Sequence, residues 1–431
     1  MYSKKNKFLI LLLLLFTTTT LFGQRVTNSP YSRYGIGDIY TLGFGHNIAK
    51  GGTSIADCSP MYLNSSNPAG ITSLQMQRFI FDVGMDTKYT TLSSNSTSQK
   101  NCNTAFKYLA GGFAAKPWWY FMFMLNPYSS VGYSMKDTTL ISFDNKQYGY
   151  YQEIEGEGGL SKISLSTSFK FLDMISVGVT GGFLFGSLDR SQRIDNIQTD
   201  NYTTSIKYQN RYFLSGFQYD LGFLFSKSIK SKKDSTKNSF KFNIGAVLGN
   251  EAKLNSRNEL FLAKYNNLEA ISDTICNDTL ADGSITIPKK IGIGVSVELF
   301  EKLTILADYT QQDWSNFSIE GENNTKLKNS TKMSFGMQYV QDKYSSRFLR
   351  QLMYRFGCHS ENTYLELNGQ SIKDQGVTFG IGVPIHSIIL NVGCDLGKRG
   401  TTNNNLYQEK YFLLHFNVTI HDIWFVKRKF Q

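Results

Sequence analysis

Hydrophobic and polar residues alternate with a period of two along many segments of this chain. The clearest example covers residues 411–420, where apolar side chains occupy one face of an extended strand and polar side chains the other. Alternation over about ten residues is typical of a tilted strand that crosses a membrane with its apolar face toward lipid. The same pattern recurs near residues 175–186, 213–225, 240–248 and 291–299. This recurrence predicts the wall of a transmembrane β-barrel.

Further segments bring the predicted number of wall strands to fourteen. They lie near residues 79–89, 104–115, 117–128, 161–171, 303–317, 330–341, 350–361, 374–384 and 386–397. An even number of antiparallel strands is usual in bacterial outer-membrane barrels. We therefore predict an all-β fold, a transmembrane 14-stranded antiparallel β-barrel with an N-terminal hatch, or plug, segment in its lumen.

The connections between these strands fall into two classes. Tight turns are expected at residues 115–117, 172–174, 301–302 and 384–386. The alternate connections are long and rich in Asn, Ser, Thr and Asp, near residues 129–160, 189–205, 250–286, 318–329, 360–373 and 398–409. Short periplasmic turns opposite long external loops are characteristic of outer-membrane barrels.

The N-terminus carries an export signal. Lys4, Lys5 and Lys7 precede an apolar run over residues 8–16, and cleavage is expected after Gly23. We therefore divide the chain into a signal peptide (1–23), an N-terminal hatch (24–75), the barrel (76–421) and a periplasmic C-terminal tail (422–431).

Composition agrees with this division. A hydrophobic content of 41% is too low for a helical membrane bundle. It fits a barrel, because polar residues of the lumen and loops dilute the lipid-facing ones. Without the signal peptide the formal charge falls from +11 to +8, which suits outer-membrane lipid and lipopolysaccharide rather than nucleic acid. Lysine-rich loops that aid solubility explain the charge equally well.

Cysteine and histidine spacing indicates neither a metal site nor an enzyme. The five cysteines show no zinc-ligand spacing, so neither a metal nor a cofactor is expected. A disulfide between Cys102 and Cys276 stays open as an alternative. Only His359, beside Glu361, lies near the predicted external rim, and one such pair is more often a solvated loop than a catalytic site.

Residues 24–75 do not alternate like the wall, and the lumen is the place available to them. Asn67 can cap a short helix that starts at Pro68, a position where the missing N–H costs nothing. Gly51 and Gly52 allow close backbone approach or a turn with positive φ.

These residues carry a resemblance to a known family. The glycine pair Gly51-Gly52 and the triplet Asn67-Pro68-Ala69, followed by a barrel, resemble the FadL family of outer-membrane transporters for hydrophobic compounds. Gly292, Asp308 and the stretch 314–317 resemble a recurring hairpin of that family, and residues 397–401 and 422–425 resemble a Bacteroidetes variety. The resemblance implies passive uptake of long-chain fatty-acid-like molecules, an apolar pocket near the hatch, and a lateral exit through the wall. It also implies that Gly51, Gly52, Asn67, Pro68 and Ala69 serve the hatch and its gating.

Residues at the inward-facing positions of the alternating strands are the candidates for the lumen. They are Gly178, Gly182, Gly292, Gly294, Glu298, Asp308, Arg355 and Asp395. The glycines either leave volume for a plug or ligand, or relieve crowding and permit curvature. We expect the acids to anchor the hatch rather than recognise cargo, and Arg355 is the inward cation available to a fatty-acid carboxylate. The alternative function is an accessory or shuttle subunit of a protein secretion or outer-membrane assembly machine, in which loops act rather than the lumen.

Overall fold

A computed structural model of the chain describes residues 27–40, 43–143, 146–197, 205–230, 238–266, 270–280, 282–319, 322–323, 327–343 and 345–424. The predicted signal peptide, the first residues of the predicted hatch and most of the predicted tail lie outside the described residues. No described helix is long and apolar enough to span a membrane.

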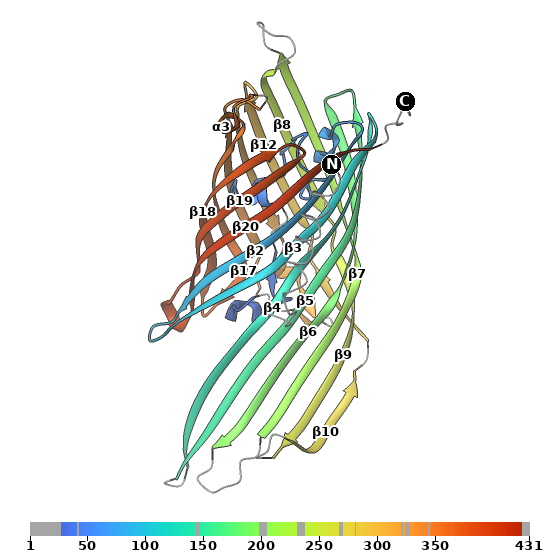
Figure 1. Ribbon diagram of the computed structural model, residues 1–431. Coiled ribbons are helices and arrows are strands. Elements are labelled where there is room, and N and C mark those ends of the chain that lie inside the picture. The colour runs from blue at the N-terminus through green and yellow to red at the C-terminus, as the bar shows by residue number, and fades with distance from the viewer. Residues whose placement is uncertain are drawn as a thin grey trace, which may run out of the picture.

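Strands make up most of the described chain (Figure 1). They are β1 (Asp38–Ile39), β2 (Arg78–Ser93), β3 (Ser98–Lys116), β4 (Trp119–Phe143), β5 (Lys146–Phe171), β6 (Ile175–Ile197), β7 (Ser205–Lys230), β8 (Asn238–Gly249), β9 (Ala252–Tyr265), β10 (Ile271–Thr279), β11 (Gly283–Ile287), β12 (Lys290–Leu299), β13 (Leu303–Gln312), β14 (Ser318–Ile319), β15 (Glu322–Asn323), β16 (Ser330–Val340), β17 (Met353–Leu367), β18 (Gln370–Ile385), β19 (Ile388–Gly400) and β20 (Gln408–Ile423). Short helices are η1 (Pro30–Arg33), α2 (Gly45–Ile48), η2 (Pro68–Ser73), η3 (Trp314–Asn316), α3 (Phe348–Gln351) and η4 (Asn403–Asn405).

The strands form a closed antiparallel barrel of fourteen wall strands, as predicted. Four wall strands are interrupted: β8 continues as β9, β10 as β11 and β12, β13 as β14, and β15 as β16. The barrel closes where β20 pairs with β2 along Arg78–Ser93. Pairing between wall strands satisfies backbone groups that would be costly to leave unpaired in the hydrocarbon layer.

Side chains alternate across the wall as the sequence predicted. Val179 on β6 faces outward with 37% of its surface exposed, whereas its neighbour Thr180 is 6% exposed and faces the lumen. On β20, Phe412, Leu414 and Phe416 face outward, whereas His415 and Asn417 are buried. Apolar side chains therefore face lipid and polar ones the lumen.

The prediction of long external loops at residues 129–160, 189–205 and 250–286 was wrong. These segments extend the wall strands beyond the rest of the barrel and pair with one another, forming a projection that Figure 1 draws below the barrel. We call it the external sheet; it comprises residues 131–143, 146–159, 186–197, 205–214, 255–265 and 271–279.

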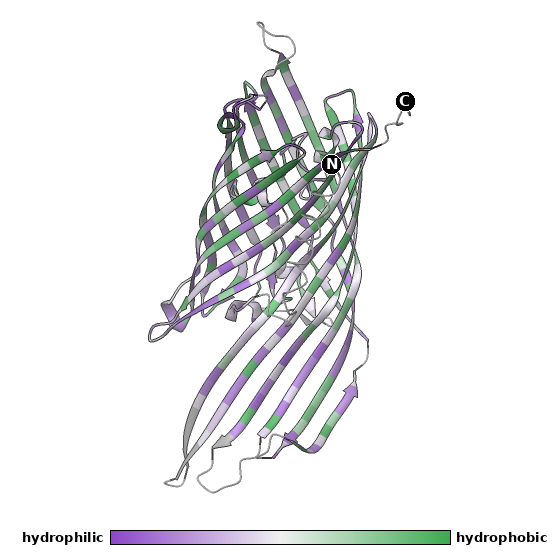
Figure 2. Cartoon of the chain, viewed as in Figure 1, coloured by the Kyte–Doolittle hydropathy of each residue, from purple (hydrophilic) through white to green (hydrophobic). Residues whose placement is uncertain are grey.

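Hydropathy changes where the external sheet begins (Figure 2). On the outer face, Phe183 and Phe185 give way to Asp189 and Arg193 on the same strand. Arg211 lies opposite Asp189 in the register and binds its carboxylate at 2.8 Å. A search for apolar lipid-facing residues therefore misses these strands, because ion pairs rather than apolar side chains cover their outer face.

The N-terminal segment lies inside the barrel, drawn in blue in Figure 1. We call its described residues, 27–40 and 43–75, the hatch, and its first part, 27–40, the strap. Phe44, Leu63, Ile71 and Leu74 of the hatch pack against buried residues of β2, β3 and β4. Tyr31 and Ile36 of the strap pack in a second cluster at the base of the external sheet. The main cores of the molecule therefore lie between hatch and wall.

Candidate functional site

Asn67 organises the start of helix η2. Its side-chain oxygen accepts a hydrogen bond from Ala69 N at 3.0 Å, and Pro68 occupies the start of the helix. The Asn67 amide also donates to the carbonyls of Ile55 (2.8 Å) and Phe223 (3.0 Å). Asn67 thus joins the helix to another part of the hatch and to wall strand β7.

Gly51 and Gly52 form a turn with φ of +69° and +83°, a region that favours glycine. Gly51 N donates to Thr378 Oγ1 of β18 at 2.8 Å. A Cβ on Gly51 would lie 2.5 Å from the carbonyl oxygen of Cys358, so the wall leaves no room for a side chain here. The glycine pair therefore brings the hatch backbone against the wall.

Charged groups within the hatch pair mainly with one another. Lys50 Nζ lies 2.6 Å from Asp57 Oδ2, and Lys50 is almost fully buried. Burial lowers the pKa of Lys50, and Asp57 opposes this shift. Burial also lowers the pKa of His46 well below 6.5, and Lys50 and Arg355 lower it further.

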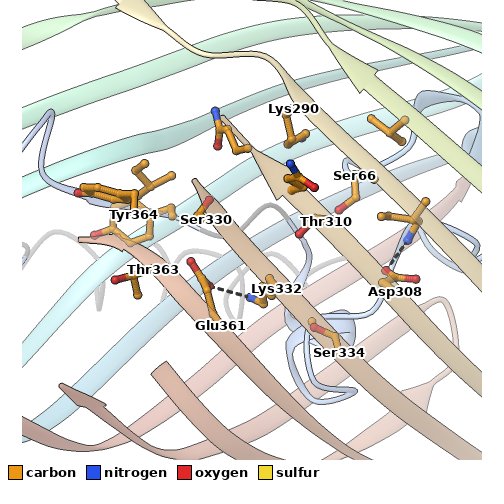
Figure 3. Close-up of a pocket in the computed structure, with 18 of the residues that line it drawn as sticks. Ser66, Lys290, Asp308, Thr310, Ser330, Lys332, Ser334, Glu361, Thr363 and Tyr364 are labelled. Atoms are coloured by element: carbon orange, nitrogen blue, oxygen red, sulfur yellow. Dashed lines mark hydrogen bonds and ion pairs between the residues drawn. The ribbon is translucent and has the colours of Figure 1, made fainter. Parts of the chain in front are cut away.

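Asp308 of β13 anchors the hatch from the wall. Its Oδ2 accepts hydrogen bonds from Ser54 N (2.6 Å) and Ile55 N (2.9 Å); Figure 3 labels Asp308. Gly294 allows this contact, because a Cβ there would lie 2.4 Å from the Asp308 carboxylate. The contact corresponds to the anchoring role expected of the inward acids.

Inward glycines of several strands face the hatch, either its backbone or its side chains. A Cβ on Gly178 would meet Pro68 at 2.7 Å, and a Cβ on Gly292 would meet Ile55 at 2.8 Å. Gly182 instead makes room for the side chain of Lys162, within the wall. Of the two explanations left open for these glycines, volume for a plug therefore applies to Gly178, Gly292 and Gly294.

The wall contains a seam between β3 and β4. The two strands pair only over Leu109–Lys116 and Trp119–Leu125, although both continue well beyond this segment. Pro127 follows directly and cannot donate a ladder hydrogen bond, which places it at an edge or bulge. Beyond this point β4 turns away from β3, and the two labelled strands diverge in Figure 1.

The strap fills the seam. Asp38 and Ile39 of β1 pair with Ser130 and Ser129 of β4. On the other side, Asn28 Nδ2 donates to Asn103 Oδ1 of β3 at 3.0 Å. Lys107 Nζ of β3 also lies 4.3 Å from the centre of the Tyr40 ring of the strap. The strap therefore closes the seam with backbone hydrogen bonds to β4 and side-chain contacts to β3.

Two cavities adjoin the strap inside the lumen. The first, of about 230 Å³, is lined by Ile55, Asp308 and polar side chains from β12 to β17 (Figure 3). The second, of about 200 Å³, lies against β2, β3 and β17 to β20 and reaches Asn103 and Lys107 at the seam. The cavities share lining residues Asp38, Ile39, Tyr40, Gly52, Lys332, Glu361, Asp374 and Arg399.

The apolar pocket expected near the hatch stays a prediction, because both cavities combine charged and apolar side chains. Carboxylates, lysines and Arg399 line both cavities together with Ile39 and Tyr40. Ile55 and Trp314 add apolar surface to the first cavity, and Ile48 and Leu413 to the second. Arg399 Nη1 binds Asp38 at 2.7 Å, and Lys332 lies 3.8 Å from Glu361. Charged side chains that pair across the lumen thus share the cavity walls with apolar ones.

Two of the four charged residues predicted for the lumen line neither cavity. Arg355 donates to Tyr62 Oη, Gln338 Oε1 and Asn391 Oδ1, each at 2.8 Å, so the expected partner of a carboxylate instead holds the hatch. Glu298 binds Lys343 at 3.1 Å near a periplasmic turn. By contrast Gly52, Gly292, Asp308 and Asp395 line a cavity.

Several cavity residues were missed by sequence reasoning. Lys88 follows the inward acids Asp82 and Asp86 on the same parity of β2, a signal that could have found it. Lys107 sits at a bulge, and Arg399 lies in a predicted loop, so parity could not place them. His359 lies beside Asp395 in the lumen rather than on the rim.

All five cysteines lie among the residues that the structure describes. All five cysteines are free, so Cys102 and Cys276 form no disulfide. Among the described residues, no group of three His, Cys, Asp or Glu side chains is placed to hold a metal ion.

Comparison with known proteins identifies both a family and a fold. A family model described as BamG matches residues 5–431. No curated protein matches the sequence. The fold is that of FadL-type outer-membrane barrels, as three solved structures show at sequence identities that bear on the fold alone.

The first of these structures is the P. putida toluene transporter TodX, with a TM-score of 0.57, 13% identity, and coverage of 90% of this chain and 100% of that one. A Pseudomonas aeruginosa FadL homologue gives a TM-score of 0.55, 11% identity, and coverage of 90% and 99%. The Ralstonia pickettii toluene transporter TbuX gives a TM-score of 0.53, 14% identity, and coverage of 88% and 98%.

Proposed function

The chain belongs to the BamG family, and from its barrel architecture we propose that it carries small amphipathic molecules passively across the outer membrane. The cargo has an apolar chain and a polar end, and long-chain fatty acids are its simplest example. The chain resembles in fold proteins named as transporters of toluene, a hydrophobic compound. Cavities with charged walls favour a cargo with a polar end over a bare hydrocarbon.

The seam between β3 and β4 is the observation that carries this proposal. A closed wall confines cargo to the lumen, whereas a seam at membrane height gives an apolar chain a route into lipid. The second cavity reaches this seam at Asn103 and Lys107. Because the strap, and not a wall strand, fills the seam, its displacement is the step we propose for lateral exit.

Uptake of labelled long-chain fatty acid and long-chain amine tests the proposal. Cells that express the protein should accumulate at least one of them faster than cells that lack it. An Asn67→Ala variant should alter uptake through hatch geometry, because Asn67 contacts Ala69, Ile55 and Phe223 rather than a cavity. Identical uptake in all three strains, with equal surface expression, would refute transport.

Crosslinking the strap to β3 tests the exit route separately. An Asn28→Cys, Asn103→Cys variant, in a background with Cys102→Ser, can be joined by a short thiol-reactive crosslinker. Uptake should fall after crosslinking, because the strap can no longer leave the seam. The same reagent on either single variant should have no effect. Unchanged uptake by the crosslinked barrel would mean that cargo leaves elsewhere.

The external sheet favours a second function, that of an accessory or shuttle subunit in a protein-handling machine. Its inner face carries Ile194, Ile206 and Tyr208, each about 40% exposed and on one side of the paired strands β6 and β7. Exposed apolar groups in a sheet beyond the membrane are suited to a protein partner.

Charge substitution on the external sheet discriminates between the two functions. An Ile194→Glu, Ile206→Glu variant should lose protein partners that co-purify in mild detergent while retaining uptake. An Arg193→Glu change on the opposite face serves as the control. Retention of partners by the double variant would rule out this face as the docking surface.

A further inference from the structure

The external sheet is open, and its two edge strands are β4 and β10 (Figure 1). Its strands follow the order β4, β5, β6, β7, β9 and β10, each paired with the next. Among the described residues, no strand pairs with the outer side of β4 beyond Ser130 or with the outer side of β10. Such an edge presents a row of backbone N–H and C=O groups to which another chain can pair.

The strap already adds a short strand to the β4 edge. β1 pairs with Ser129 and Ser130 in the antiparallel direction, and Ser29 N donates to Gly132 O at 2.9 Å. Gly132 N in turn donates to Ser32 Oγ at 3.1 Å. Both backbone groups of Gly132 therefore point to the outer edge, which accepts an extended segment beside it.

The row of edge groups continues beyond the strap. Alternate residues of a strand point their N–H and C=O groups to the same side, so those of Ser134 and Lys136 face the outer edge as those of Gly132 do. Thr138 N follows the same rule, since it donates to the side chain of its neighbour Asp137 at 2.9 Å. The edge thus offers a regular set of donors and acceptors outside the membrane.

The two edges of the sheet differ in regularity. β10 pairs with β9 through two shifts in register, between Ile271 and Asp273 and between Thr274 and Cys276. Irregularities of this kind keep further strands from adding to an edge. β4 keeps one register with β5 from Ser129 to Phe143. Its edge is therefore the one suited to a partner strand.

Side chains beside the β4 edge define the chemistry of that strand. On the inner face, Tyr133 is buried, and Met135 packs against the apolar cluster at the base of the external sheet. On the outer face, Ser134 is exposed, and the exposed Lys136 binds Glu153 of β5 at 3.0 Å. A strand that matches both faces alternates apolar with uncharged polar residues.

We propose that an extended segment of another protein pairs with β4 beyond Gly132, in the antiparallel direction that β1 takes. Main-chain hydrogen bonds give the affinity, and apolar side chains at alternate positions give the specificity. The inference rests on the second proposed function, that of a protein-handling subunit, and it names a strand edge as a docking site.

Membrane orientation argues against a second copy of this chain as the occupant. Copies in one membrane face the same way, so their β4 strands would run parallel to each other. β1 shows that the edge accepts an antiparallel strand, and antiparallel pairing is the more stable of the two per residue.

Binding of labelled peptides to the purified full-length barrel tests the edge. The probe is a short peptide that alternates valine with threonine, and fluorescence anisotropy gives its affinity. The outer-face residues of β4 point their N–H groups to the edge, so in an antiparallel pair the outward threonines of the peptide point theirs to β4. N-methylation of the threonines should therefore weaken binding at least about tenfold, whereas N-methylation of the valines should not. No binding of the unmethylated peptide, or equal loss from both methylations, would overturn the proposal.

Two variants of one residue locate the peptide. Ser134→Pro removes an N–H that faces the edge and leaves the ladder between β4 and β5 intact, because proline is tolerated on an edge strand. It should weaken binding of the peptide about tenfold, since it also obstructs the partner strand. Ser134→Ala keeps the N–H and should bind like the unaltered barrel. Undiminished binding by a correctly folded Ser134→Pro barrel would refute the site.

Hydrogen exchange in the isolated barrel tests whether the edge is free. The amides of Ser134 and Lys136 should exchange fast, and those of Tyr133 and Met135, which point to β5, should exchange slowly. Slow exchange at all four would mean that a second copy or another segment of this chain already covers the edge, which would refute the proposal.

The edge and the protein-handling function fail separately. Peptide binding that depends on the threonine amides, in a barrel that co-purifies with no protein, would support the edge and refute the function. Partners that co-purify with unaltered and Ser134→Pro barrels alike, with no peptide binding, would refute the edge alone.

Discussion

Replacing Asp308 by alanine removes an acceptor shared by two backbone donors of the hatch. Asp308 Oδ2 lies 2.6 Å from Ser54 N and 2.9 Å from Ile55 N. Hydrogen bonds to a charged group contribute about 1.5–3 kcal/mol each, and water that enters the gap recovers part of the loss. The closed state of the hatch should therefore lose about 3 kcal/mol, which shifts the ratio of closed to open barrels about a hundredfold.

Single-channel recording in planar bilayers measures this shift as the fraction of time spent at high conductance. Asp308→Asn should give an intermediate result, because the amide keeps an acceptor oxygen but loses the charge. Glu298→Ala is the matched control, since Glu298 faces the lumen and binds Lys343 outside the hatch. If Asp308→Ala and Glu298→Ala barrels conduct alike, the wall carboxylate does not hold the hatch.

Three further changes follow from the same geometry. Val179→Arg should impair insertion into vesicles by about 2–4 kcal/mol, whereas Thr310→Arg, in a lumen cavity, should insert nearly normally; equal folding yields would contradict the register. Deleting residues 24–75 should raise permeability to small polar solutes, because hatch side chains fill much of the lumen; unchanged conductance would mean that something else closes it. Since burial holds the pKa of His46 well below its unfolded value of 6.5, His46 takes up a proton more readily in a loosened hatch, so closure should weaken as pH falls below 6.5. Asp57, 3.8 Å from His46, is already paired with Lys50, and a His46→Gln barrel should lose this pH dependence of conductance.

Local chemistry made the wall predictable from the sequence. Each wall strand must turn apolar side chains to lipid, so the alternation of Val179 with Thr180, and of Phe416 with Asn417, reveals both the strand and its two faces. Strand number followed, because every lipid-facing segment carries the same pattern. The helix start at Asn67-Pro68 could also be predicted from the sequence, because the capping side chain binds a backbone N–H only two positions along the chain.

Contacts between distant residues decided the rest. The seam depends on where β4 stops pairing with β3, and Pro127 is the main sign of it in the sequence. The sequence predicts loops where the external sheet lies, because strands that do not face lipid need no apolar outer face and so lack the alternation that marks the wall.

The candidate site belongs to the same class of feature. Arg355 was available by parity to a cargo carboxylate, yet Tyr62, 293 residues away in sequence, takes its guanidinium. His359 and Asp395 approach to 3.3 Å only because β17 and β19 lie on either side of β18 in the closed wall. Alternation along one strand shows whether each side chain faces lipid or the lumen. Only closure of the barrel around the hatch determines which side chains face one another, because that pairing arises between strands far apart in the chain.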